Sequence, residues 1–377
     1  MNTNRDIITA LQRASIDYSG FEVVDKLVAR VIPPEFPYSA TFECFSLGDL
    51  LKTSLILKVL EAVSPNMKIH LRVTQEYFDY EEIRDLVVAN YDGIMTPVPP
   101  SGARRVAFMD TLVDSYSPHS LKFDAVFPTA LLAPIHGVGA SLRRQVGRAI
   151  LGITEEERVL VVSNFSSLDL SALDLGHIED RAMREDFVTT HLARQIPVST
   201  LASIVNHAAK QGGFDRVVLV PRNIEEERVS IQQLQGQGVS LVKLDSGHFD
   251  SSCSSYIIGG KGVLRSVYAM ADAALVAGYH NILEPYLCNE SCIIRCIQPP
   301  ARAPNRFLFD AGQRLGILKC LENLPSNLRD VRCFFDSLGQ RNRQPSHSTY
   351  YRDELCLRSI DEAAGNLNRI LSELLAC

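Results

Sequence analysis

Apolar and polar residues follow one another in blocks that predict strands and helices in alternation. The short apolar runs predict strands at 40–45, 68–74, 93–98, 157–164, 214–223, 239–245, 256–259, 273–277 and 292–297. Between them, apolar residues at helical spacing predict helices at 50–63, 81–91, 200–211, 225–238 and 263–271. This alternation is typical of parallel sheets with crossover helices. We therefore predict an α/β fold with two Rossmann-like parallel-sheet domains.

The length of the chain also favours two domains, because 377 residues exceed what one hydrophobic core usually holds. We predict a first domain at 1–148, a second at 149–345, and a C-terminal segment at 346–377. In that segment, leucines and isoleucines from Asp353 to Leu375 predict a helix that crosses back to the first domain. Residues 99–146 contain two apolar stretches whose structure the pattern leaves open.

A charged stretch at 166–198 interrupts the second block of strands and helices. We expect an insertion there, with a helix around Ile178–Arg194. The function of this insertion is left open.

Composition and charge narrow the classes of function. The net charge of −6 gives no field that would attract nucleic acid. The chain opens with a polar stretch, and no run approaches the ~20 apolar residues that span a bilayer. The nine cysteines are an odd number, and several lie in apolar runs, which fits a reducing compartment. We expect a cytoplasmic protein that binds no nucleic acid. Its oligomeric state is left open.

Three cysteines, Cys288, Cys292 and Cys296, are spaced by four residues, which raises the question of a metal. Zinc sites usually use Cys-x-x-Cys pairs on turns, and no second pair with matching spacing occurs. Cys292 and Cys296 belong to a predicted strand, where both would face the same side. We expect buried thiols and no metal or other cofactor.

Polar clusters follow several predicted strands, at the carboxyl ends where ligands bind in doubly wound sheets. These clusters are 46–49, 163–164, 221–223, 259–262 and 278–284. A Gly-x-Gly at 137–139 precedes a basic stretch, but it lacks a third glycine, and we expect a plain loop there.

Individual residues in these clusters suit a nucleotide, although each also has a structural explanation. Asn281 could donate to a phosphate or only cap a helix, and Glu284 could bind ribose hydroxyls or only favour a first helical turn. Arg222 could pair with a phosphate or with Glu225 or Glu226. The turn of Gly260, Lys261 and Gly262 could hold an anion or be a flexible turn.

Several of these stretches resemble 3-deoxy-D-manno-octulosonic acid (Kdo) transferases in sequence and order. The matching stretches are VVLVPRN at 217–223, GGKGVLRSVYAMADAALVAG at 259–278 and HNILEP at 280–285, with fainter similarity in FECFSLGD at 42–49 and SLKFDAVFP at 120–128. The similarity covers 42–74 and 120–298, apart from the insertion. HNILEP in its context is the most specific part.

The resemblance implies the GT-B fold of two Rossmann-like domains, with a CMP-activated sugar held mostly by the second domain. Residues that would contact the nucleotide are Ser163, Arg222, Gly260, Lys261, Gly262, Asn281 and Glu284. The partners it implies are a nucleotide-sugar donor and a glycan or lipid-linked acceptor. A lipid-linked acceptor would add peripheral contact with the inner face of the membrane, which we leave open.

The sequence also departs from that family. The acidic turn of the family is Ile258 to Val263 here and carries no acid, and the first domain is short. Transfer to a hydroxyl needs a general base, for which Glu22 and Asp49 are the candidates, although each could instead be structural, as an acid that only caps a helix. On the basis of the resemblance, we predict a glycosyltransferase. The alternatives are a nucleotide-sugar-binding homologue without catalysis, and a nucleotide-sugar hydrolase or epimerase on the same fold.

Overall fold

The computed structural model describes most of the chain between residues 140 and 339 and shorter pieces on either side. The described residues are 7, 9–11, 14–15, 28–32, 39–44, 59, 61–63, 68–73, 94–96, 104–109, 125–128, 140–167, 175–176, 181–192, 195–221, 224–244, 253–258, 263–277, 284–289, 291–296, 313, 318–320, 328–339, 364–365, 368–369 and 372. The chain divides into two compact units. Unit 1 comprises Met1–Ala14 and Ala140–Ser348, and unit 2 comprises Ser15–Gly139 and Thr349–Cys377. The domain boundaries 1–148, 149–345 and 346–377 stay predictions.

Unit 1 is built on a seven-stranded sheet in which every strand pair is parallel. Its strands are β6 (Val159–Phe165), β7 (Arg216–Pro221), β8 (Val242–Lys243), β9 (Ser255–Ile257), β10 (Ala273–Val276), β11 (Ile293–Cys296) and β12 (Leu318–Cys320). They lie in the order β12-β11-β10-β6-β7-β9-β8. Strands β7, β8 and β9, which follow β6 in the sequence, lie on one side of β6. Strands β10, β11 and β12, which come later, lie on its other side. The order therefore reverses between β6 and β10.

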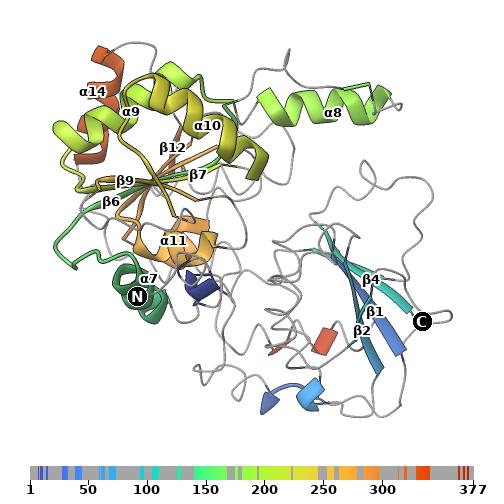
Figure 1. Ribbon diagram of the computed structural model, residues 1–377. Coiled ribbons are helices and arrows are strands. Elements are labelled where there is room, and N and C mark those ends of the chain that lie inside the picture. The colour runs from blue at the N-terminus through green and yellow to red at the C-terminus, as the bar shows by residue number, and fades with distance from the viewer. Residues whose placement is uncertain are drawn as a thin grey trace. The chain divides into compact units, whose positions relative to one another are not determined.

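Helices cover both faces of this sheet, as a doubly wound fold requires. They are α7 (Ala140–Ile150), α9 (Val198–Lys210), α10 (Ile224–Gly236), α11 (Leu264–Met270), α12 (Glu284–Cys288) and α14 (Leu328–Gly339), with α8 (Arg181–Leu192) in the predicted insertion. Figure 1 shows α9, α10 and α14 on one side of the strands and α7 and α11 on the other. Helix α12 packs against α11 and β11.

The inner strands of unit 1 are buried along most of their length. Residues 159–162, 217–220 and 273–276 are all apolar and at most 1% exposed. Alternate side chains of β6 and β7, such as Leu160 and Leu219, join the core under α9, α10 and α14. Continuous apolar runs, without polar alternation, are expected for parallel strands covered on both faces. This is why these strands were predictable from the sequence.

Two elements of unit 1, β12 and α14, were missed by the sequence analysis. Helix α14 places Val331, Phe334, Phe335 and Leu338 in the core against α9. Their three- and four-residue spacing is a helical signal that could have found this helix. Strand β12 has three residues and only Leu318 is buried, so its pattern is too short to read.

Unit 2 contains a five-stranded parallel sheet. Its strands are β1 (Ser39–Cys44), β2 (Lys68–Val73), β3 (Ile94–Thr96), β4 (Arg104–Met109) and β5 (Ala125–Pro128). They lie in the order β3-β2-β1-β4-β5. The first strand is in the middle, with β2 and β3 on one side and β4 and β5 on the other, as in a Rossmann sheet. The sequence predicted β1 to β3, and β4 and β5 lie in the region it left open. The predicted helix at 81–91 lies outside the described residues.

The C-terminal segment groups with unit 2. Its described residues, 364–365, 368–369 and 372, are helical. The side-chain oxygen of Asn368 accepts from the Ile32 backbone N–H at 2.7 Å, and its amide nitrogen donates to the Arg30 carbonyl at 3.2 Å. The α/β class with two parallel-sheet units is confirmed. Within the described part of the chain, no helix has both the length and the apolar character that crossing a bilayer demands.

Candidate functional site

The carboxyl ends of β6 and β10 form the place where the strand order of unit 1 reverses. Ser163, near the end of β6, is in register with Val276, the last residue of β10. The Ser163 carbonyl accepts a hydrogen bond from the Ala277 backbone N–H at 3.0 Å. In doubly wound sheets, ligands bind in the crevice outside the strand ends at this switch point. The predicted site residue Ser163 therefore lies where the topology favours a ligand.

Tyr268 of α11 holds the side chain of Ser163. The Ser163 hydroxyl and the Tyr268 phenol are 2.7 Å apart, and both residues are fully buried. Burial, and then the charge of Glu284, raise the pKa of Tyr268 well above its usual value. The phenol therefore stays neutral at physiological pH and serves as a hydrogen-bonding group. The sequence places Tyr268 in a helix similar to one of the Kdo transferases, but sequence reasoning missed this contact.

Glu284 opens α12 and acts on the same cluster. It is partly buried, and its negative charge contributes to the raised pKa values of both Tyr268 and Cys288. Ser163 and Glu284, predicted separately, thus both act on the Tyr268 side chain, Ser163 through a hydrogen bond and Glu284 through its charge. Because Ser163 and Glu284 are far apart in the sequence, the sequence alone did not indicate that Tyr268 would interact with both.

The backbone beyond Ser163 leaves the regular strand geometry. Asn164 has a φ of +58°, in the left-handed region, which Asn adopts more readily than most residues. At the same point the register between β6 and β7 shifts, since Ser163 pairs with Val220 while Phe165 pairs with Pro221. Such bulges interrupt a ladder, and they recur next to active sites. The irregularity falls at the ligand-binding edge predicted by the topology.

Seven of the predicted site residues lie outside the described part of the chain. They are Glu22, Asp49, Arg222, Gly260, Lys261, Gly262 and Asn281. The described elements bracket several of them: β7 ends at Pro221 and α10 begins at Ile224, while β10 ends at Val276 and α12 begins at Glu284. Their roles stay predictions.

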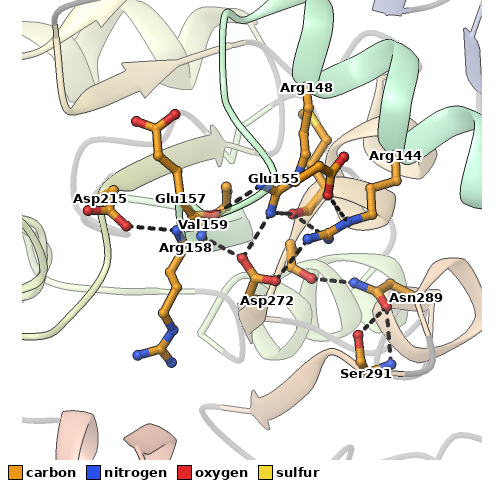
Figure 2. A network of polar contacts seen from close by, with 12 residues as sticks. Arg144, Arg148, Glu155, Glu157, Arg158, Val159, Asp215, Asp272, Asn289 and Ser291 are labelled. Atoms are coloured by element: carbon orange, nitrogen blue, oxygen red, sulfur yellow. Dashed lines mark hydrogen bonds and ion pairs between the residues drawn. The ribbon is translucent and has the colours of Figure 1, made fainter.

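A second polar cluster lies at the opposite, amino-terminal edge of the sheet and is centred on Asp272 (Figure 2). Its carboxylate accepts from the Val159 backbone N–H at 2.8 Å and from the guanidinium groups of Arg148 at 3.0 Å and Arg144 at 3.2 Å. Arg148, only 1% exposed, also donates to the carbonyl of Met270 at 3.1 Å. The carboxylate thus ties α7 to the starts of β6 and β10.

The basic stretch of α7 has a structural role, because its arginines form contacts within unit 1. Two of its arginines pair with Asp272, and the third, Arg143, donates to the Ala14 carbonyl at 3.0 Å. Burial, and then the charge of Arg144, lower the pKa of Arg148, and Asp272 opposes both effects. The three guanidinium groups therefore form contacts that stabilise unit 1.

The cysteines near the candidate site are buried thiols. Cys288, Cys292 and Cys296 are free and at most 3% exposed. Burial raises the pKa of Cys288 to about 12 and that of Cys292 well above its usual value. Among the described residues, no group of three or more His, Cys, Asp or Glu side chains is arranged to hold a metal.

Comparisons with known proteins identify no family. No family model matches the sequence, and no curated protein matches it. Among solved structures, UDP-GlcNAc 2-epimerase from Neisseria meningitidis is similar over 90% of this chain and 100% of its own, at 10% identity and a TM-score of 0.47. The C-terminal CMP-Kdo binding domain of WaaA from Acinetobacter baumannii is similar over 62% of this chain and 99% of its own, at 14% identity and a TM-score of 0.35.

A family 9 glycosyl transferase from Veillonella parvula is similar over 90% of this chain and 99% of its own, at 12% identity and a TM-score of 0.36. At such identities and TM-scores, these likenesses assign neither a family nor an activity to the chain. The described residues show a seven-stranded and a five-stranded parallel sheet, with the hydrogen bond between Ser163 and Tyr268 at the switch point of the larger one.

Proposed function

We propose that this protein is a GT-B glycosyltransferase that takes its sugar from a nucleotide donor. The observation that carries the proposal is the position of Ser163, at the carboxyl end of β6 and in register with the last residue of β10. That point is the topological switch of the sheet, where doubly wound folds bind nucleotides. Glu284, independently predicted to contact the nucleotide, acts on Tyr268, which is the hydrogen-bond partner of Ser163.

The residues that follow neighbouring strands in the sequence would supply the chemistry that a nucleotide needs. Arg222 follows β7 in the sequence, and Lys261 precedes α11, so two cations are available for phosphate. Gly260 and Gly262 would leave backbone N–H groups accessible to an anion, and Asn281 can donate a further hydrogen bond. Glu284 would accept from the ribose hydroxyls.

The class of donor follows from the resemblance to Kdo transferases. We propose a CMP-linked, Kdo-like sugar as donor and a glycan or lipid-linked molecule as acceptor. Cations at the leaving phosphate would stabilise the charge that develops as the glycosidic bond breaks. Glu22 or Asp49 would take the proton of the acceptor hydroxyl. Peripheral contact with a membrane would accompany a lipid-linked acceptor.

A nucleotide-sugar-binding protein without catalysis is the second candidate. It is favoured by the sequence of residues 258–263, which has no acid where the Kdo transferases have two. Such a protein would bind the donor and release no nucleotide from it. The two candidates therefore differ in turnover while sharing the binding site.

Thermal unfolding with CMP, UMP, UDP, GDP and ADP tests the binding site. A nucleotide at about 100 times its dissociation constant should add about 2.7 kcal/mol to the stability. We expect CMP to stabilise the wild-type chain, with the effect lost in Arg222→Ala and reduced in Ser163→Ala. Ser203→Ala is the matched control, because the Ser203 hydroxyl donates within α9 to the Ser199 carbonyl at 2.8 Å and the residue is partly exposed.

Each outcome of this test has a definite meaning. Stabilisation by a nucleoside diphosphate alone would retain the site and replace the donor class. No stabilisation by any nucleotide would overturn the proposal. If CMP binds, release of CMP from a CMP-sugar in the presence of acceptor distinguishes the transferase from the binding protein.

A further inference from the structure

Two cysteines end neighbouring strands of unit 1. Cys296 is the last residue of β11, Cys320 is the last residue of β12, and the two are partners in the parallel register. Neighbouring strands lie about 4.8 Å apart, and residues in register point to the same face of the sheet. This spacing falls within the Cα separations of about 4.4–6.8 Å that a disulfide can span.

The environments of the two thiols differ in a way that suits stepwise oxidation. Cys296 is 1% exposed, whereas Cys320 is partly exposed and can meet a reagent from solvent. The two thiols share a hydrogen bond, and this bond, together with burial, raises the pKa of Cys296. Cys296 therefore keeps its proton, and Cys320 is the thiol placed to react first. Cys288 and Cys292 also lie near one another, but both are buried away from reagents.

The pair belongs to a row of residues that crosses the sheet to the candidate site. Ser163 of β6, Val276 of β10, Cys296 of β11 and Cys320 of β12 are successive partners in register. They therefore share the face on which Tyr268 contacts Ser163. Two strand spacings, about 10 Å, separate β6 from β11.

We propose that Cys296 and Cys320 are a thiol–disulfide exchange site that closes to a reversible cross-strand disulfide with small disulfides such as oxidised glutathione. The Cys320 thiolate attacks one sulfur of the small disulfide, whose S–S bond breaks and releases one thiolate. Cys296 then gives up its proton and attacks the Cys320 sulfur, which releases the second thiolate. Two protein thiols are oxidised and one small disulfide is reduced to two thiols, which take up the two protons. The product links β11 covalently to β12 at the carboxyl edge.

Tryptic peptides separate the relevant cysteines, so the product can be assigned without ambiguity. Cleavage after Arg295 and Lys319 places Cys296 in the peptide 296–302 and Cys320 in the peptide 320–329. Cleavage after Arg332 places Cys333, which is exposed, in a third peptide that serves as an internal control.

The full-length folded chain is incubated with oxidised glutathione, blocked with an alkylating agent and digested without reduction. We expect the peptides 296–302 and 320–329 to be joined by a disulfide that dithiothreitol cleaves. In Cys296→Ser, Cys320 should retain glutathione as a mixed disulfide, because the second thiol is missing. In Cys333→Ser, the joined peptides should form as in the wild type.

The wild-type experiment alone can overturn the proposal, so it does not depend on how the variants fold. A stable mixed disulfide at Cys320 with Cys296 still alkylatable would show that the pair does not close. The same conclusion follows if glutathione reacts at Cys333 while Cys320 stays reduced. Joined peptides that appear only after denaturation would also contradict it, since the geometry of the folded sheet is the basis of the proposal.

Discussion

The Ser163 hydroxyl and the Tyr268 phenol lie 2.7 Å apart in the interior of unit 1, joining β6 to α11 at the switch point of the sheet. Neither residue is exposed, so water cannot replace either hydroxyl as the hydrogen-bond partner of the other. The contact connects the topology of the fold to the site that the sequence predicts.

Replacing Tyr268 with Phe should therefore destabilise unit 1. The variant keeps the ring but leaves the buried Ser163 hydroxyl without this partner, at a cost of about 1–3 kcal/mol. Ser163→Ala should cost a similar amount, and the double variant less than the sum, because both changes remove the same bond. Urea unfolding of the four proteins measures the coupling. Additive effects would show that the hydrogen bond contributes nothing to stability.

Replacing Asp272 with Asn should break the cluster at the amino edge of the sheet. Arg148 is buried and would lose its carboxylate partner, while Asp272 itself is 26% exposed. We expect a loss of about 2–3 kcal/mol, less than the about 3–5 kcal/mol of a fully buried pair. Glu155→Gln is the control, because this carboxylate also pairs with Arg144 but is 58% exposed. It should cost under about 1 kcal/mol in urea unfolding, and equal effects would contradict the structural role of Asp272.

Replacing Gly147 with Ala should loosen the contact between α7 and α11. A Cβ at this position would lie 2.7 Å from the Met270 sulfur and 2.9 Å from its Cγ, too close without movement of the helices or the side chain. Overpacking of this kind costs about 1–3 kcal/mol. Gly236→Ala in α10 is the matched control, since its Cβ would meet nothing within 4 Å. That variant should be stabilised by about 0.4–1 kcal/mol in thermal unfolding.

The stability of unit 1 should decline in mild acid because of His207. Burial, and then the charge of Arg332, lower the pKa of His207 below 6.5, while Asp336 acts in the opposite direction. The unfolded chain then binds more protons than the folded chain as the pH falls below 6.5, so stability falls with pH until the lower, folded pKa is passed. Unfolding free energies across this range should show a smaller slope in His207→Gln. An unchanged slope would assign the acid sensitivity to other groups.

Local patterns in the sequence determined the elements that are buried on both sides. The apolar runs of β6, β7 and β10 predicted the parallel sheet, because a strand covered on both faces has no place for polar residues. Polar residues at the ends of those runs singled out Ser163 and Glu284, since the carboxyl ends of such strands are the ligand-binding edge. Short elements with one buried face, such as β12, gave too few residues for a pattern.

Contacts between distant parts of the chain were decided by the tertiary structure. Asp272 meets Arg148 across 124 positions, and Tyr268 meets Ser163 across 105, so no local spacing could pair them. Cys296 and Cys320 become partners only because β12 is placed beside β11 in a particular register. The sequence by itself determined the long buried strands of unit 1 and predicted that a ligand would bind at their carboxyl ends. Strand order and helix packing then decided which side chains touch, because these depend on burying the whole core at once.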